Sequence, residues 1–276
     1  MIGAATDNGR LVDPIHSPWL RCCAVILAAA ALFAIITGAA FTTNEYRPFY
    51  SLGQSHLLVG ALVGVLTIVL VIWLLLTEKR VWIRRLAWIA LATVVVEGLL
   101  GFVTGPQPPA VRYFHAFLAQ LFFATTVAIA VFTSRGWTRI PELVRCRPSV
   151  RILAMMIAIL VLAQAALGVA FRHGVMDVTL HILGALVVAL FVVALALSVL
   201  YRSGHEPLRP AGVTLLIVTA LQVFLGLGLF SMGSPDIDPA AVIVVTIVHA
   251  ATAALTLAAT VVMAVLVLCV PASANR

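Results

Sequence analysis

Charged residues are scarce in this sequence: Asp, Glu, Lys and Arg make up 10% of the 276 positions, whereas hydrophobic residues make up 63%. A water-soluble domain of this length cannot bury so much apolar surface, so that class of protein is excluded. The apolar residues form long runs without alternation of apolar and polar positions. Such runs predict helices rather than strands.

Eight of these runs are long enough to cross a hydrocarbon layer of roughly 30 Å, which takes about 20 residues of helix. We expect membrane helices at 19–41, 56–77, 82–104, 113–133, 150–171, 178–201, 211–232 and 241–270. The predicted fold class is an all-α integral membrane protein. The polar start of the chain has no small-residue cleavage site after a short apolar core, so we expect the first helix to be retained and not removed as a signal peptide.

The basic residues are distributed unevenly between the two sides of the predicted membrane. Fourteen of the 17 Lys and Arg residues lie in the termini and in the loops after even-numbered helices, and three lie on the other side. These three are Arg47, Arg112 and Arg172. The positive-inside rule then places both termini in the cytoplasm. We expect the membrane to be a bacterial-type plasma membrane. Membrane topology accounts for the net charge of +7, which therefore does not indicate nucleic-acid binding.

Cysteine is also rare, with four residues in the chain. All four fall at or near the basic side of the predicted membrane: Cys22, Cys23, Cys146 and Cys269. No cysteine lies in a loop on the opposite side, so we expect no disulfide there.

The eight helices repeat as four hairpins of similar design. Each odd-numbered helix ends near a glycine: Gly38, Gly101, Gly168 and Gly226. One helical turn before each glycine stands Ala34, Glu97, Gln164 or Gln222. Each even-numbered helix opens with a histidine: His56, His115, His181 and His249. Four residues later, on the same helix face, stands a small residue: Gly60, Ala119, Ala185 or Ala253.

The basic loop between the fourth and fifth helices divides the chain into two halves that start on the same side. We expect an N-terminal segment at 1–18, one four-helix half at 19–133, a linker at 134–149 and a second four-helix half at 150–270. Halves with the same orientation predict two similar bundles, related by a pseudo-two-fold axis along the membrane normal.

Histidine is costly inside a bilayer and often marks function there. Each histidine could simply donate to a backbone carbonyl at the membrane interface. Four imidazoles could also hold a bare zinc or copper ion, but each half contains only two of them. Two imidazoles that face each other across a flat cavity suit a heme iron with axial ligands from opposite sides. The small residues would leave room for the porphyrin.

Other polar residues have weaker interpretations. Arg47, Arg112 and Arg172 could pair with heme propionates or could only anchor helices at the interface. We expect His16, His173 and His205 to be solvated loop residues.

The openings of the even helices read "QSHLLVGALVG", "YFHAFLAQ", "LHILGALVVA" and "IVHAATAAL", and odd helices close with Q-x-x-x-G. This pattern, over residues 19–270, resembles the heme A synthase family. The resemblance implies that His56 and His115 hold the substrate heme O, and that His181 and His249 ligate a heme b cofactor. It also implies oxidation of a heme methyl group to a formyl group during cytochrome oxidase assembly, with heme O synthase or assembly proteins as partners, and a homo-oligomer.

The sequence departs from the family at one important position. Members carry a glutamate three residues before the first histidine of the second helix, where this chain has Gly53. Glu97 is the only carboxylate within the predicted membrane spans, and we consider it as a substitute catalytic acid or as a polar group hydrogen-bonded between helices. Glu45, in the first loop, is a weaker candidate.

Three other functions remain open at this stage. A di-heme electron carrier and a heme-handling assembly factor both require the histidines but not the missing acid. A solute transporter fits less well, because broken helices and ionic pairs at mid-membrane depth are not apparent in the sequence.

Overall fold

The computed structural model describes residues 6–7, 10–11, 17–43, 50–102, 107–134, 148–201, 208–233 and 237–268. These residues form eight long helices: α1 (Pro18–Thr43), α2 (Tyr50–Thr77), α3 (Val81–Gly101), α4 (Pro109–Phe132), α6 (Pro148–Arg172), α7 (Thr179–Tyr201), α8 (Arg209–Ser231) and α9 (Pro239–Leu268). Before them, β1 (Thr6–Asp7) pairs antiparallel with β2 (Arg10–Leu11).

Seven of the described helices are long and apolar enough to cross a membrane. The eighth, α3, has 21 residues and carries Arg84, Arg85 and Glu97. These charges lie towards its two ends, and residues 86–96 between them are uncharged. The protein is an all-α membrane protein, as the sequence predicts. In lipid, a helix satisfies its own backbone hydrogen bonds, which explains why the apolar runs are helical.

The predicted helix boundaries differ most at the starts of α2 and α4. The helix α2 begins at Tyr50, and α4 begins at Pro109. Polar residues in these first turns hide the helix start from a reading by hydropathy. Proline at the first position sets the start of α4, because its missing N–H would have no partner inside the helix.

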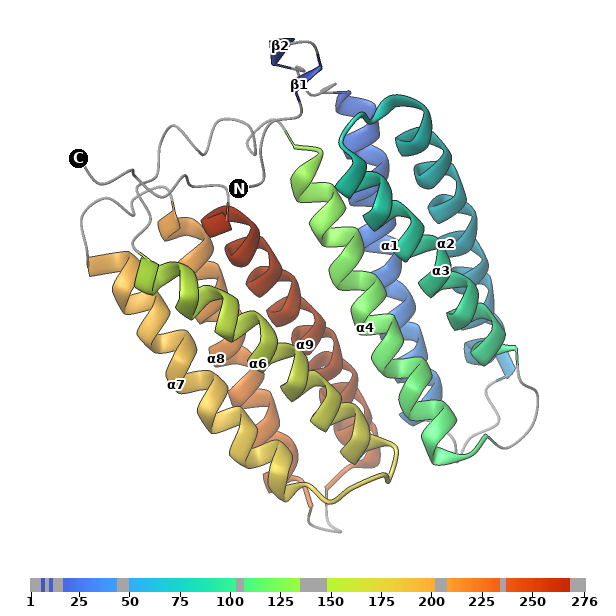
Figure 1. The fold of residues 1–276 in the computed structure, drawn as a ribbon. Coiled ribbons are helices and arrows are strands. Elements are labelled where there is room, and N and C mark those ends of the chain that lie inside the picture. The colour runs from blue at the N-terminus through green and yellow to red at the C-terminus, as the bar shows by residue number, and fades with distance from the viewer. Residues whose placement is uncertain are drawn as a thin grey trace.

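The helices form two bundles, each closed in a ring (Figure 1). In the N-terminal bundle, α1 to α4 contact one another in order and α4 returns to α1. The helices α6 to α9 repeat this ring in the C-terminal bundle. Each bundle has its own buried apolar cluster, with Leu27, Leu70 and Ile129 in the first and Leu195 and Met263 in the second.

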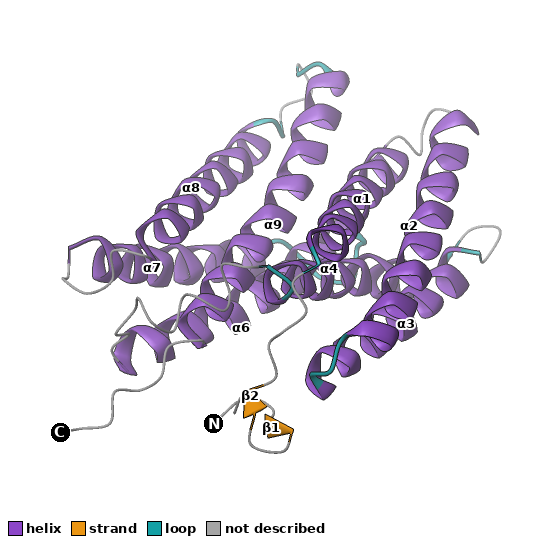
Figure 2. Ribbon diagram, turned by 90° about the horizontal axis from the view of Figure 1, so that it is seen from above, coloured by secondary structure: helices purple, strands orange, loops and turns teal. Residues whose placement is uncertain are grey.

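The interface between the bundles is formed by α1 and α4 on one side and by α6 and α9 on the other. The contacts are α1 with α9, α4 with α9, and α4 with α6. A two-fold rotation that exchanges the bundles replaces α1 by α6 and α4 by α9. It therefore turns the α1–α9 contact into the α4–α6 contact and leaves the α4–α9 contact unchanged. Figure 2 shows α2 and α3 on one outside of the molecule and α7 and α8 on the other.

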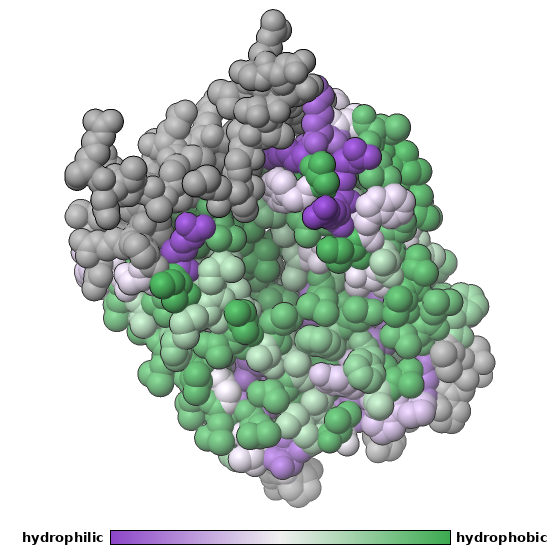
Figure 3. Space-filling view, viewed as in Figure 1, coloured by the Kyte–Doolittle hydropathy of each residue, from purple (hydrophilic) through white to green (hydrophobic). Residues whose placement is uncertain are grey.

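The surface and the helix ends have different chemistry. Large apolar side chains such as Leu76, Leu190 and Phe224 are exposed on the outward helix faces, and apolar residues cover the middle of the face in Figure 3. We call the end that holds Pro18, Val81 and Leu268 the basic end, because five helical arginines lie near it. They are Arg21, Arg84, Arg85, Arg151 and Arg209. We call the other end the histidine end.

Candidate functional site

The four histidines meet as two pairs at the histidine end, one pair in each bundle. His56 of α2 and His115 of α4 have ring centroids 6.2 Å apart and ring planes at 87°. His181 of α7 and His249 of α9 have centroids 6.4 Å apart and planes at 88°. The two bundles therefore present nearly the same arrangement of imidazoles.

The depth of the histidines within their helices is less uniform than their equivalent positions in the repeat suggest. His56 and His115 each lie six residues after the first residue of their helix, whereas His181 lies two residues and His249 ten residues after it. Helix packing, rather than distance from the helix start, brings the rings together.

In the N-terminal bundle, each histidine contacts a polar side chain of the preceding odd helix. Nδ1 of His56 lies 3.1 Å from Oγ1 of Thr37. Nδ1 of His115 lies 2.8 Å from Oε2 of Glu97. Ala34 occupies the repeat position of Glu97 but has no polar side chain, so Thr37 supplies the contact instead.

The C-terminal bundle uses glutamine at both equivalent positions. The Nε2 atom of Gln164 lies 2.9 Å from Nδ1 of His181 and donates to the carbonyl of the same histidine at 2.8 Å. The Nε2 atom of Gln222 lies 3.2 Å from Nε2 of His249. In all four cases a ring nitrogen lies against the odd helix, and in the C-terminal bundle the group that it meets is a glutamine amide nitrogen, which donates.

The glycines of the odd helices allow the rings to approach the backbone. A Cβ atom at Gly38 or Gly168 would lie 2.9 Å from Cε1 of His56 or His181. At Gly226 the corresponding distance to His249 is 3.2 Å, and at Gly101 the distance to His115 is 3.5 Å. An alanine would collide with the ring at the first two positions, would crowd it at Gly226, and would make ordinary contact at Gly101.

Several buried polar atoms at the histidines have no hydrogen-bond partner within the described part of the chain. They are Glu97 Oε1, His115 Nδ1, Gln164 Oε1, Gln222 Oε1 and His249 Nδ1, although His115 Nδ1 lies 2.8 Å from Glu97 Oε2 as an ion-pair contact. Buried polar groups are usually satisfied in native proteins, so such a concentration marks a polar site that a ligand could complete.

The small residues that follow the histidines differ in the space around them. A Cβ at Gly60 would meet open space, and this position is exposed. In α7, Gly184 rather than Ala185 makes room for a neighbour, because a Cβ at Gly184 would collide with Oε1 of Gln164.

Gly53 of α2 faces the end of α1. A Cβ at Gly53 would lie 3.1 Å from the ring of Phe41. The phenyl ring therefore stands where a longer side chain at position 53 would begin.

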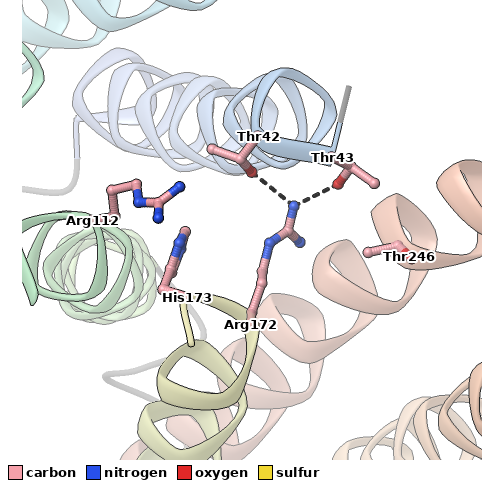
Figure 4. A pocket seen from close by; sticks show the side chains of 6 residues that line it. All are labelled: Thr42, Thr43, Arg112, Arg172, His173 and Thr246. Atoms are coloured by element: carbon pink, nitrogen blue, oxygen red, sulfur yellow. Dashed lines mark hydrogen bonds between the residues drawn. The ribbon is translucent and has the colours of Figure 1, made fainter. Parts of the chain in front are cut away.

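A cavity of about 240 Å³ lies at the histidine end between the two bundles. Its lining residues come from α1, α4, α9 and the end of α6, and they are Thr42, Thr43, Arg112, Arg172, His173 and Thr246 (Figure 4). The helical arginines of this end, which the sequence suggested as propionate contacts, are thus brought to one shared cavity.

Arg172 crosses from the C-terminal bundle to the end of α1. Its Nη2 atom donates to the carbonyl of Ala39 at 2.8 Å, to Thr42 Oγ1 at 2.8 Å and to Thr43 Oγ1 at 2.7 Å. These bonds tie the two bundles together at the histidine end.

The expectation that His173 is a solvated loop residue is wrong. Its side chain is 7% exposed and points into the cavity (Figure 4). Burial, followed by the positive charges of Arg172 and Arg112, lowers the pKa of His173 to about 4. His173 is therefore neutral at physiological pH. Its position after the last residue of α6 gave no sequence signal of burial.

Some predicted residues lie outside the described residues: Arg47, Glu45, His16 and His205. Within the described ranges, no group of three or more His, Cys, Asp or Glu side chains is arranged to hold a metal ion. Each candidate centre thus offers two imidazoles. No protein-family model matches the chain, and no curated protein matches it.

Proposed function

We propose that this protein binds two hemes, one in each bundle, and that the two histidines of each bundle would hold its iron. The separation of the rings carries this proposal. Two imidazoles from separate helices would hold one heme iron only where their rings come close together. The observed separations are 6.2 and 6.4 Å.

The donor set favours a porphyrin over a bare ion. Zinc and copper sites in proteins usually need three or four protein ligands. A porphyrin supplies four nitrogens of its own, so two imidazoles complete the coordination of its iron.

The oxygen atoms beside the N-terminal pair fit the role of supporting groups for iron ligands. A ligating histidine usually donates its other ring N–H to an oxygen acceptor, which fixes the ring orientation and its basicity. Thr37 and Glu97 place oxygen atoms beside the rings, whereas Gln164 and Gln222 place their amide nitrogens there. The glycines beneath the rings let the histidines press against the odd helices.

The reaction that we propose is that of heme A synthase. The pair His56 and His115 would hold the substrate heme O, and the pair His181 and His249 would ligate a heme b cofactor, which supplies electron transfer when bound. Conversion of the methyl group and one water molecule to a formyl group releases four protons and four electrons, so an electron acceptor from outside the chain is required. Arg47, Arg112 and Arg172 remain candidate propionate contacts.

Glu97 is the residue of the N-terminal bundle that we propose for proton handling in this reaction. Its 2.8 Å contact with Nδ1 of His115 also allows it to act as a positioning residue for an iron ligand. These roles are separable, because a glutamine at position 97 keeps a hydrogen-bonding side chain but cannot take up a proton.

Heme content and heme A formation test the proposal. Purified protein should contain low-spin bis-histidine heme, and added heme O should be converted to heme A. Glu97→Gln should keep the heme spectrum but lose the conversion. Protein without bound heme, and without affinity for heme O, would refute the proposal.

A second candidate is a di-heme electron carrier or heme-handling assembly factor that binds heme without oxidising it. The position of Gly53 against Phe41 favours this candidate, because the side chain there is absent and its space is partly taken by the phenyl ring. Heme binding without heme A formation in wild type would support it. Activity gained by Gly53→Glu combined with Phe41→Ala would identify a lost enzyme that kept its cavity.

We also propose that the protein lies in a bacterial-type plasma membrane with its basic end in the cytoplasm. The separation of Arg21, Arg84 and Arg85 from Arg112 and Arg172 to opposite helix ends supports this orientation. Reporter fusions at both termini should report from the cytoplasm. Reporters at the termini that are active outside the cell would show that the orientation is the opposite one.

A further inference from the structure

Equivalent positions of the repeat meet where the two bundles join at the histidine end. Thr42 stands four residues after Gly38, and Arg172 stands four residues after Gly168. The two side chains bond each other, because Nη2 of Arg172 donates to Oγ1 of Thr42 at 2.8 Å (Figure 4). The repeat therefore places a threonine in one half and an arginine in the other, so that one half donates where the other accepts.

The end of α1 receives its positive charge from the other bundle. The last turn of α1 contains no basic residue of its own. A cation at the end of a helix meets the negative end of the helix dipole and can bond the last carbonyl groups. Arg172, the last residue of α6, donates from Nη2 to the carbonyl of Ala39 at 2.8 Å and to the hydroxyls of Thr42 and Thr43 at 2.8 and 2.7 Å. Arg172 thus caps α1 across the interface between the bundles.

The capped part of α1 is continuous with the surface on which His56 rests. Oγ1 of Thr37 lies 3.1 Å from Nδ1 of His56, and a Cβ at Gly38 would lie 2.9 Å from Cε1 of the same ring. Thr42 connects the two regions, because its hydroxyl donates to the carbonyl of Gly38 at 3.0 Å. Helix ends fray when their terminal groups are not held. Loosening of the last turn of α1 would therefore loosen the contacts of His56.

We propose that Arg172 is a positioning residue for His56, so that the N-terminal histidine pair depends on a side chain of the C-terminal half. The other histidine of the pair does not share this support. Nδ1 of His115 contacts Glu97 of α3, whereas the three bonds of Arg172 go to α1. The role of His56 as an iron ligand belongs to the proposed function, but the support of α1 by Arg172 stands without a heme.

The first experiment measures the exposure of each histidine in purified, heme-free full-length protein. Diethyl pyrocarbonate modifies accessible imidazoles, and mass spectrometry follows each histidine separately. Arg172→Gln should speed the modification of His56 by about threefold or more, because the last turn of α1 frays and uncovers the ring. His115 and His181 should keep their wild-type rates. Arg172→Lys, which keeps a cation at the end of α1, should restore part of the protection.

A double variant separates the hydrogen bonds from the charge. Thr42→Val combined with Thr43→Val removes the two hydroxyls that accept from Arg172 but keeps the guanidinium group, and it should also speed the modification of His56. This variant also serves as the test if Arg172→Gln folds poorly. Thr246→Val is the matched control, because Thr246 lines the same cavity but donates within its own helix, to the carbonyl of Val242 at 2.7 Å. Its histidines should react as in wild type.

A heme titration tests the same role in the ligated protein, and this arm rests on the proposed function. His181→Ala and His56→Ala backgrounds isolate the N-terminal and the C-terminal pair, respectively. Arg172→Gln and the threonine double variant should each weaken heme binding at the N-terminal pair about tenfold and leave the C-terminal pair unchanged, although Arg172 belongs to the C-terminal half. A loss in the double variant cannot come from a missing contact between Arg172 and a propionate.

The two arms fail in different ways. Wild type that binds no heme would refute the proposed function and leave the modification experiment in force. The positioning role is overturned if His56 reacts at its wild-type rate in both Arg172→Gln and the threonine double variant, or if His115 and His181 accelerate as much as His56. Equal losses of heme affinity at the two pairs would also overturn it.

Discussion

The two bundles hold their histidines at almost the same separation but support them with different side chains. Threonine and glutamate face the rings of the N-terminal pair, whereas glutamine faces both rings of the C-terminal pair. The ring separations differ by only 0.2 Å, from 6.2 to 6.4 Å. The repeat thus keeps the position of the imidazoles and varies the charge behind them.

This difference separates what a metal centre needs for binding from what sets its chemistry. The geometry of two imidazoles determines whether an iron can be ligated. The groups behind the imidazoles determine ligand basicity and therefore the reduction potential of the iron. Among the described residues, only the N-terminal pair has a carboxylate in contact, so we expect the two proposed hemes to behave differently.

The largest expected effect comes from removing a histidine. His181→Ala and His249→Ala should each abolish the bis-histidine spectrum of the C-terminal heme and leave the N-terminal heme in place. His56→Ala and His115→Ala should do the reverse. Heme content and absorption spectra of the four purified variants measure this. If all four variants kept full heme content, the assignment of both pairs as ligands would be wrong.

A second comparison uses the glycines beneath the rings. Gly168→Ala should displace His181 and weaken heme binding in the C-terminal bundle by at least tenfold, because the new Cβ would lie 2.9 Å from Cε1 of the ring. Gly101→Ala is the matched control, since its Cβ would make ordinary contact with His115 at 3.5 Å. Heme titrations of both variants distinguish them. Equal affinities would show that the close approach is not required.

The carboxylate of the N-terminal bundle can be removed and one can be introduced into the C-terminal bundle. Glu97→Gln should raise the reduction potential of the N-terminal heme, and Gln164→Glu should lower that of the C-terminal heme, each on the order of tens of millivolts. The carboxylate stabilises the more positive oxidised centre, which explains the sign. Spectroscopic redox titration measures both potentials. Unchanged potentials in both variants would mean that these side chains do not influence the iron.

A smaller effect concerns the basic end of the N-terminal bundle. Arg80 donates to both carboxylate oxygens of Glu78 at 2.9 and 2.7 Å and to the carbonyl of Phe132 at 3.3 Å, which links the α2–α3 loop to the end of α4. Burial alone would raise the pKa of Glu78, but the hydrogen bonds and charge of Arg80 outweigh burial and hold the pKa below the usual 4.5.

This pair predicts a pH dependence of the stability of the N-terminal bundle. A carboxylate with a lowered pKa in the folded protein stabilises the fold above its unfolded pKa, and the stabilisation is lost as pH falls through the folded pKa. The Tm of wild type should therefore fall below pH 4.5 by more than that of Glu78→Gln, measured by thermal unfolding in detergent. Parallel pH profiles of the two proteins would contradict this assignment.

Much of the fold was predictable because membrane insertion imposes strong constraints on sequence. Apolar runs of about 20 residues have few alternatives to a spanning helix. The starts of α2 and α4 were less predictable, because polar residues such as Gln54 and Arg112 continue the helix beyond its apolar part. The pairing of His56 with His115 and of His181 with His249 was also predicted, from the two histidines in each half of the chain and from the family resemblance.

The contacts around the histidines were predicted only in part. Glu97, Gln164 and Gln222 stand one turn before a glycine, so their proximity to the rings follows from helix periodicity. Thr37 does not occupy that position, and nothing in its sequence context distinguishes it from the other threonines of the chain. Its contact with His56 depends on the rotation of α1 against α2.

The sequence alone therefore determined that this is a helical membrane protein, that it repeats in two halves, and that its histidines lie at one end. These properties follow from hydropathy and from spacing along single helices. Tertiary structure decided how the halves meet, and so placed Arg112, Arg172 and His173 around one cavity. Residues from separate helices of different bundles have no fixed spacing in the chain, and only the packing of α1, α4, α6 and α9 brings them together.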